Sequence, residues 1–225
     1  MALHWIMFLP ALLLLFYPLE VFLPSKSFCM RELNYIDFSQ ASVRRRGPWN
    51  FPAFWADGLR SFLGALLLRN AWTIESGRDW LHNVPAVSFF IIISLSIIAQ
   101  MHARHSRERF LAPVTYVVGL WLALLPLPAA LVAVAAGGVC MVAFRSLSAF
   151  FFFGAATVGV FGYLALRAGS WAMVAAVIGV VPYILSMLGR RSLAVPVRIE
   201  VMRERSRDVS TGKVVRMAGR NKIKV

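Results

Sequence analysis

Apolar residues fill the carboxyl-terminal half of the chain almost without interruption. Residues 110–188 contain only two charges, Arg145 and Arg167, and residues 109–199 contain no Asp or Glu. A water-soluble domain of this length carries carboxylates on its exposed faces, whereas side chains in lipid avoid charge. The pattern predicts an all-α fold, namely a polytopic transmembrane helical bundle of about six spans with an amphipathic interfacial helix and a short basic C-terminal tail.

Five apolar segments are predicted to form a five-span transmembrane bundle over residues 84–188. Pro126 and Pro128 separate the second segment from the third, so a tight helical hairpin is expected there. None of the last four segments carries an Asp, Glu, His or Lys, the side chains that proton-coupled carriers and ion pumps place near the bilayer midplane. The five segments are residues 84–100, 112–125, 128–143, 147–166 and 170–188.

The amino-terminal apolar block, residues 1–24, predicts one more transmembrane helix. A secretory signal peptide begins with Lys or Arg, and here only His4 precedes the apolar core. A weak small-x-small pattern at residues 25–27 leaves cleavage open as the alternative. We favour a retained anchor helix.

Residues 25–83 form the only extended polar stretch before the tail, and four tryptophans lie in it. Because tryptophan prefers the headgroup layer, this stretch is predicted to lie along the membrane surface. Residues 55–72 within it predict an amphipathic helix. Its uncharged core between Arg60 and Arg69 is too short to cross about 30 Å of hydrocarbon. An interfacial or re-entrant helix is therefore favoured over a crossing one. The four tryptophans are Trp49, Trp55, Trp72 and Trp80.

Asp57 and Arg60, three residues apart in this predicted helix, are a candidate buried polar pair. If the helix crosses the membrane, the pair would be turned inward, where ionisable residues generally indicate function. If the helix lies at the surface, the pair is a solvated contact that contributes about 0.2–0.5 kcal/mol. The surface version is favoured, because the helix itself is expected at the interface.

Charge predicts the orientation and the partner. The net charge is +14 and the basic residues flank apolar segments, so anionic lipid headgroups are the expected partner and nucleic acid is not. The positive-inside rule then places the carboxyl terminus in the cytoplasm, in a bacterial inner membrane. Five arginines are expected to bind anionic lipid and to set this topology: Arg104, Arg107, Arg109, Arg190 and Arg191.

The number of crossings before residue 84 stays open. Six spans in total place the triplet at residues 44–46 outside, against the positive-inside rule, and seven spans place it in the cytoplasm. Seven spans require the helix at residues 55–72 to cross the membrane. We favour six, because a loop of this length is near the limit at which charge still directs topology.

The tail, residues 189–225, is basic and is expected in the cytoplasm. Val197, Ile199 and Val201 alternate with Arg198 and Glu200, which is typical of a strand. A return strand around residues 214–215 would complete a small β-hairpin. An unfolded tail attracted to lipid is the alternative.

Small residues recur at helical spacing in three of the predicted spans. Such ladders let helix backbones approach closely, either within the bundle or between copies. Because Ala and Gly are common in membrane helices, ordinary packing is favoured over a specific oligomer interface. The helix-packing candidates are Ala129, Ala133, Gly137, Ala155, Gly159, Ala175 and Gly179.

No catalytic constellation stands out in the sequence. Residues 25–83 contain Ser, His and Asp, but no nucleophile elbow, paired carboxylate or glycine-rich phosphate loop frames them. We expect no catalytic residue, metal site or cofactor. The favoured function is a non-catalytic scaffold or accessory subunit that packs with other membrane helices, associates with itself or binds lipid. The alternative is a small transporter or a lipid-modifying membrane enzyme that uses the polar residues of 25–83.

Overall fold

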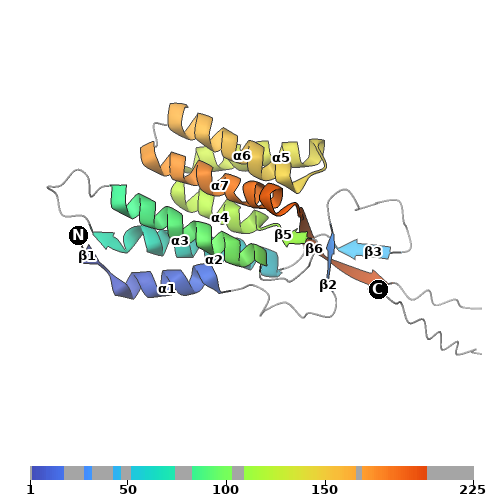
Figure 1. Cartoon of the computed structure of the whole chain (residues 1–225), viewed down its shortest axis with the longest axis horizontal. Coiled ribbons are helices and arrows are strands. Elements are labelled where there is room, and N and C mark those ends of the chain that lie inside the picture. The colour runs from blue at the N-terminus through green and yellow to red at the C-terminus, as the bar shows by residue number, and fades with distance from the viewer. Residues whose placement is uncertain are drawn as a thin grey trace, which may run out of the picture.

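The computed structural model describes residues 2–17, 28–31, 43–46, 52–73, 83–102, 109–165 and 169–201. Within these residues the chain is mostly helical, as predicted, and the helices lie side by side with alternating direction (Figure 1). The amino-terminal helices are α1 (Trp5–Phe16), α2 (Pro52–Asn70) and α3 (Asn83–His102). The others are α4 (Val114–Leu124), α5 (Leu127–Ala143), α6 (Leu147–Thr157), its π-helical continuation η5 (Val158–Ala165) and α7 (Gly169–Gly189).

All six apolar segments predicted from the sequence coincide with helices, but several of these helices are short. In the described residues, two have the length and composition to cross a membrane, over Pro85–His102 and Trp171–Gly189. Helix α1 has 12 residues and α4 has 11. At 1.5 Å per residue they reach about 18 Å and about 16 Å, against about 30 Å of hydrocarbon. The predicted bundle of six spans is therefore not confirmed.

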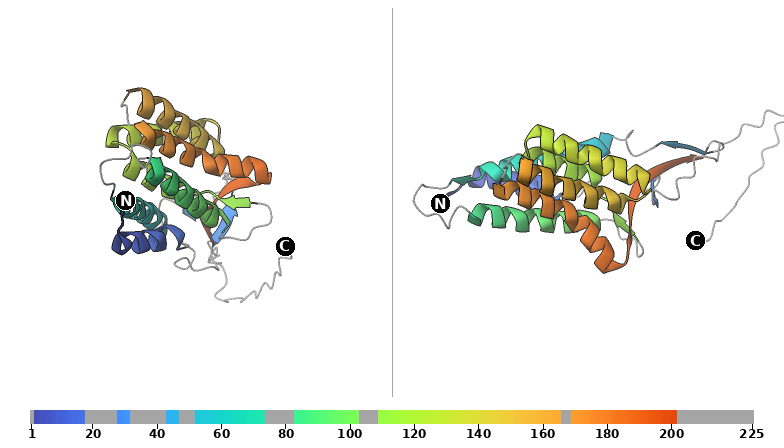
Figure 2. Two further views of the ribbon diagram at one scale, coloured as in Figure 1. Left: turned by 60° about the vertical axis from the view of Figure 1, so that its left-hand side comes forward. Right: turned by 90° about the horizontal axis from the view of Figure 1, so that it is seen from above.

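Short strands at the two ends of the bundle tie distant segments together. At one end, β1 (Ala2–Leu3) pairs antiparallel with β4 (Trp72–Thr73), so the start of α1 lies beside the end of α2. At the other end, β6 (Ser192–Val201) pairs antiparallel with β2 (Phe28–Arg31) and β3 (Val43–Arg46), and parallel with β5 (Arg109–Leu111). This sheet lies where α3 and α7 end (Figure 2).

The sheet corrects part of the sequence analysis. The alternation at residues 197–201 does belong to a strand, but the partners of β6 come from residues 28–31, 43–46 and 109–111, all upstream of it. The proposed return strand at residues 214–215 lies outside the described residues. The fold is thus mainly helical, with a small sheet that a purely α-helical class leaves out.

Trp121 of α4 fills the centre of the interface with α6 and α7. Its ring is fully buried, and its Nε1–H donates to the Ala175 carbonyl at 3.1 Å. A methyl group added at Gly154 would lie 2.5 Å from Cη2 of this ring, and one added at Gly179 would lie 2.6 Å from Cζ2. Both glycines therefore leave the space that the indole occupies.

The small residues of α5 face α6 within the same chain. Ala129 and Ala133 are buried, and a Cβ at Gly137 would lie 2.9 Å from the Phe150 carbonyl oxygen. Ala155 is also buried, and a Cβ at Gly159 would meet the methyl group of Ala176 at 3.8 Å. These small residues permit close packing between helices of one bundle.

Candidate functional site

The most polar place in the described bundle is built around Asp57 and Arg60, near the start of α2. The i,i+3 spacing puts both on one face of the helix, and Arg60 Nη2 donates to Asp57 Oδ1 at 2.6 Å. The Arg60 side chain is 11% exposed and the Asp57 side chain is 12% exposed. A solvated contact at the surface, the version favoured from the sequence, does not fit these values, because the pair is turned into the bundle.

Helix α2 can bring this pair inward because it packs directly on α4. Their backbones meet at Gly58 and Gly119, and a Cβ at Gly119 would collide with the Gly58 carbonyl oxygen and with Ser61 Oγ. Ser61 Oγ donates to the Gly58 carbonyl at 2.9 Å and so adds no unpaired polar group to this contact. The close approach places the Arg60 guanidinium over the ring of Tyr116, 5.5 Å from its centroid.

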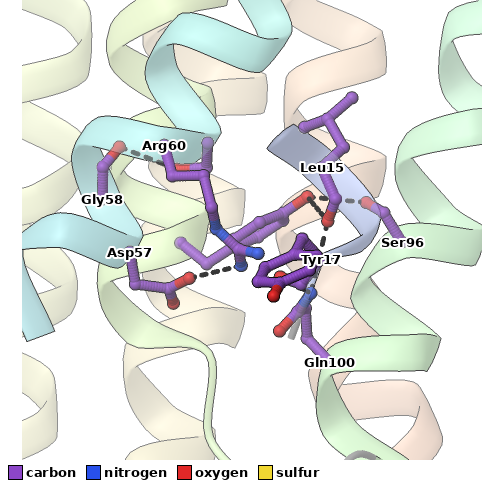
Figure 3. A network of polar contacts seen from close by, with 9 residues as sticks. Leu15, Tyr17, Asp57, Gly58, Arg60, Ser96 and Gln100 are labelled. Carbon is purple, nitrogen blue, oxygen red and sulfur yellow. Dashed lines mark hydrogen bonds and ion pairs between the residues drawn. The ribbon is translucent and has the colours of Figure 1, made fainter. Parts of the chain in front are cut away.

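The Tyr116 hydroxyl links this pair to the end of α1. Figure 3 shows Asp57 and Arg60 on one side of this network and Leu15, Ser96 and Gln100 on the other. The Tyr116 hydroxyl lies 2.8 Å from Ser96 Oγ of α3 and donates to the Leu15 carbonyl at 3.1 Å. Gln100 Nε2, also on α3, donates to the carbonyls of Leu15 at 3.2 Å and Tyr17 at 3.4 Å. The last carbonyls of a helix lack intrahelical partners, so these two side chains satisfy the buried end of α1. Four helices thus meet in one polar network.

Two polar groups of Arg60 remain unsatisfied in this network. Its Nε and Nη1 are buried and have no hydrogen-bond partner among the described residues. The charge itself is compensated by the Asp57 carboxylate and by the face of the Tyr116 ring. Because a guanidinium has only donors, these two N–H groups could donate to an anion or a carbonyl oxygen.

The Tyr116 and Ser96 hydroxyl groups of this network bond to each other and to backbone carbonyls. Among the described residues, neither hydroxyl bonds to a side chain that could act as a base. Among the described residues, no three His, Cys, Asp or Glu side chains come together as metal ligands would. His102 Nδ1 lies 2.9 Å from the Ile98 carbonyl oxygen, and the His102 ring lies beside that of Phe110.

Apart from Arg60 and Arg69 of α2, the described arginines lie at the end of the bundle that carries the sheet. Arg109 lies in β5, and Arg190 and Arg191 lie between α7 and β6, with the Arg191 guanidinium 5.1 Å from the centre of the Phe110 ring. Arg145, between α5 and α6, is at the same end because α5 and α7 run in the same direction (Figure 1). The triplet at residues 44–46 lies in β3, which pairs with β6. Arg104 and Arg107 lie outside the described residues.

The partners of the Asp57–Arg60 pair were missed in the sequence. Ser96 and Gln100 lie in α3 and Tyr116 lies in α4, and in such predominantly apolar helices an isolated polar residue is usually a packing detail. They could have been found as polar residues on the faces of α3 and α4 that the apolar pattern predicts to point into the bundle. Comparison with known protein families, with curated proteins and with solved structures found no match.

Arg60→Gln is predicted to destabilise the bundle by about 2–3 kcal/mol, because it leaves the Asp57 carboxylate buried without its partner. Adding Asp57→Asn should recover most of this loss, since the double variant contains no unpaired charge. Thermal unfolding of the purified variants in one detergent measures both effects. A double variant no more stable than Arg60→Gln would show that the ion pair does not account for the loss.

Proposed function

We propose that the chain is an integral membrane protein whose helices are embedded together, and that it acts as a non-catalytic scaffold or accessory subunit binding lipid and neighbouring membrane helices. One observation carries this proposal: the outward faces of the helices are apolar along their length. Ile6 of α1 is 90% exposed and Leu188 of α7 is 78% exposed. In water the outward face of a helix is polar, and a contiguous apolar face marks contact with lipid or protein.

The exposed apolar residues follow helical spacing, which supports lipid-facing stripes over scattered exceptions. On α3 they recur every four residues, at Val87, Ile91 and Leu95. On α7, Met173 and Val177 share a face with Ile184 and Leu188, and on α5 Leu131, Val139 and Val142 are exposed. Because such apolar stripes occur on several helices, few outward faces of the described helices are suited to contact with water.

For the orientation, we propose that α2 is embedded with the other helices, as the seven-span alternative requires, and that the sheet end lies in the cytoplasm. This differs from the six favoured by sequence, and two contacts support it. Helix α2 packs within the bundle against α4, and β3 with its three arginines joins the same end as Arg109 and Arg190. The positive-inside rule is then obeyed at residues 44–46 as well. The short α1 would end inside the bundle, where Gln100 and Tyr116 satisfy its carbonyls.

The experiment is membrane extraction combined with labelling from one side. The full chain should stay in the membrane after carbonate washing. In a variant with Cys29 and Cys140 replaced by Ser, a cysteine at His4→Cys should react with a membrane-impermeant maleimide added to intact cells, and one at Arg190→Cys should react only after lysis. Release by carbonate would refute the membrane proposal. Labelling of position 190 in intact cells would refute the orientation alone.

A second function, a small transporter or lipid-modifying enzyme, is favoured by the two unsatisfied donors of Arg60. Under this alternative, Arg60 would hold an anionic group of the substrate, beside Tyr116 and Asp57. The Asp57→Asn and Arg60→Gln double variant separates the two proposals. A scaffold retains its abundance and its co-purifying partners in this variant, whereas a transporter or enzyme retains its abundance and loses the flux or lipid conversion that depends on the chain.

A further inference from the structure

Helices α5 and α7 end with an arginine in a backbone conformation that normally selects glycine. Arg145 has φ 49° and Arg190 has φ 48°, and they are the two non-glycine residues with positive φ among those described. This left-handed conformation crowds the Cβ of an L-residue, so helices that end in it usually place glycine there.

Hydrogen bonds define the same motif at both helix ends. After α5, the Ser146 N–H donates to the Met141 carbonyl at 3.2 Å and the Arg145 N–H donates to the Val142 carbonyl at 3.3 Å. After α7, the Arg191 N–H donates to the Ser186 carbonyl at 3.1 Å and the Arg190 N–H to the Met187 carbonyl at 3.2 Å. Both are complete Schellman motifs, in which the backbone alone gives no reason for arginine over glycine.

The two arginines also share their surroundings. Both are exposed, at the end of the bundle that carries the sheet, and no carboxylate of the described residues forms an ion pair with either. Each follows an exposed apolar surface: Val142 and Phe144 precede Arg145, and Met187 and Leu188 precede Arg190. Each arginine therefore follows the point where an outward apolar helix face stops, which in a membrane is the level of the headgroups.

We propose that Arg145 and Arg190 bind the phosphate groups of anionic phospholipids in the leaflet at this end. The proposal rests on the membrane function above and names the lipid that this function takes. A guanidinium can donate two parallel hydrogen bonds to one phosphate, which suits it to this contact. The charge of the headgroup selects anionic over zwitterionic lipid, because two unpaired cations attract net negative charge. Acyl chains of the same lipids would cover the exposed ends of α5 and α7.

The test compares the wild type with the Arg145→Gly and Arg190→Gly double variant, both as full chains in detergent. Native mass spectrometry measures how much phosphatidylglycerol each retains from an equal mixture with phosphatidylcholine. The wild type should prefer phosphatidylglycerol, and each arginine removed should lower this preference roughly fivefold. The glycine variant should unfold at no lower temperature than the wild type in phosphatidylcholine alone, because glycine suits the left-handed position.

Two further variants control for charge and for folding. Replacement of both arginines by Lys retains the charge and should retain most of the preference. Replacement of both arginines by Gln removes the charge without adding backbone freedom. If the glycine variant fails to fold, the glutamine variant is compared with the wild type instead. An unchanged preference in the glycine or glutamine variant would overturn the proposal, as would a wild type that shows no preference. A wild type that needs no detergent to remain dispersed would instead refute the membrane function.

Discussion

Gly119→Ala is expected to prevent α2 from packing on α4. A Cβ at this position would collide with the backbone carbonyl oxygen of Gly58 and with Ser61 Oγ, closer than non-bonded atoms approach. The Ser61 side chain could rotate away, but the carbonyl belongs to the helix backbone and can move only with α2 itself. We expect a loss of about 4 kcal/mol or more in the free energy of unfolding, since the helices must separate or shift.

The matched control is Gly138→Ala, a second glycine in a helix of the same bundle. A Cβ at Gly138 would have nothing within 4 Å, and replacing a helical glycine by alanine favours the helix by up to about 1 kcal/mol. Size-exclusion profiles and thermal unfolding in detergent should therefore show a monodisperse Gly138→Ala protein and an aggregated or strongly destabilised Gly119→Ala protein. Equal behaviour of the two variants would mean that α2 and α4 do not meet at Gly119.

The close contact at Gly119 also explains why sequence patterns misplaced the polar pair. The charges at residues 57, 60 and 69 interrupt the apolar pattern of α2, and this argues for an interfacial helix when α2 is considered alone. Burial of that face depends on Gly58, Ser61 and Gly119, of which the last is more than fifty residues away along the chain. A pattern within one segment carries no information about such a contact.

The positions of the helices could be predicted, and the five segments of residues 84–188 begin and end within two residues of the observed helices, but the end of α1 could not be predicted. Apolar runs bounded by Pro126 and by charged connectors correspond to helices because a lipid-facing or buried backbone must satisfy its own hydrogen bonds. The amino-terminal helix is predicted over residues 1–24, and α1 ends at Phe16. Its end is set by Gln100 and Tyr116, which bond the carbonyls of Leu15 and Tyr17 from other helices. These partners lie more than eighty residues away in the sequence.

The sheet illustrates a different limit. β6 alternates in the way of a strand and was anticipated, but β2 and β3 have four residues each and β5 has three. Segments this short show no periodicity that can be distinguished from chance. Pairing between distant strands is decided by the helices that bring them together. Here α3 and α7 end side by side, so β5 and β6, which follow these helices, begin as neighbours.

Trp121→Ala is the second substitution expected to have a large effect, because it removes the side chain that α4, α6 and α7 share. The indole is fully buried, stacks on Phe150 with ring centres 5.8 Å apart, and donates to the Ala175 carbonyl. Truncating a buried aromatic residue costs about 3–5 kcal/mol, and the Ala175 carbonyl loses its extra donor as well. Trp5→Ala, at a tryptophan that is 60% exposed, is the control and should cost less than about 1 kcal/mol.

A double-mutant cycle tests whether the indole occupies the space left by Gly154 and Gly179. In the wild type, Gly179→Ala should be strongly destabilising, because its methyl group would lie 2.6 Å from Cζ2 of Trp121. In the Trp121→Ala background the contact with the ring is gone and the remaining close contact is Ala155 Cβ at 3.0 Å, so the same substitution should be much less destabilising. The coupling energy from thermal unfolding in one detergent should therefore reach about 2–3 kcal/mol. Additive effects would mean that Trp121 and Gly179 do not touch, and the packing of α4 against α7 would have to be different from that described.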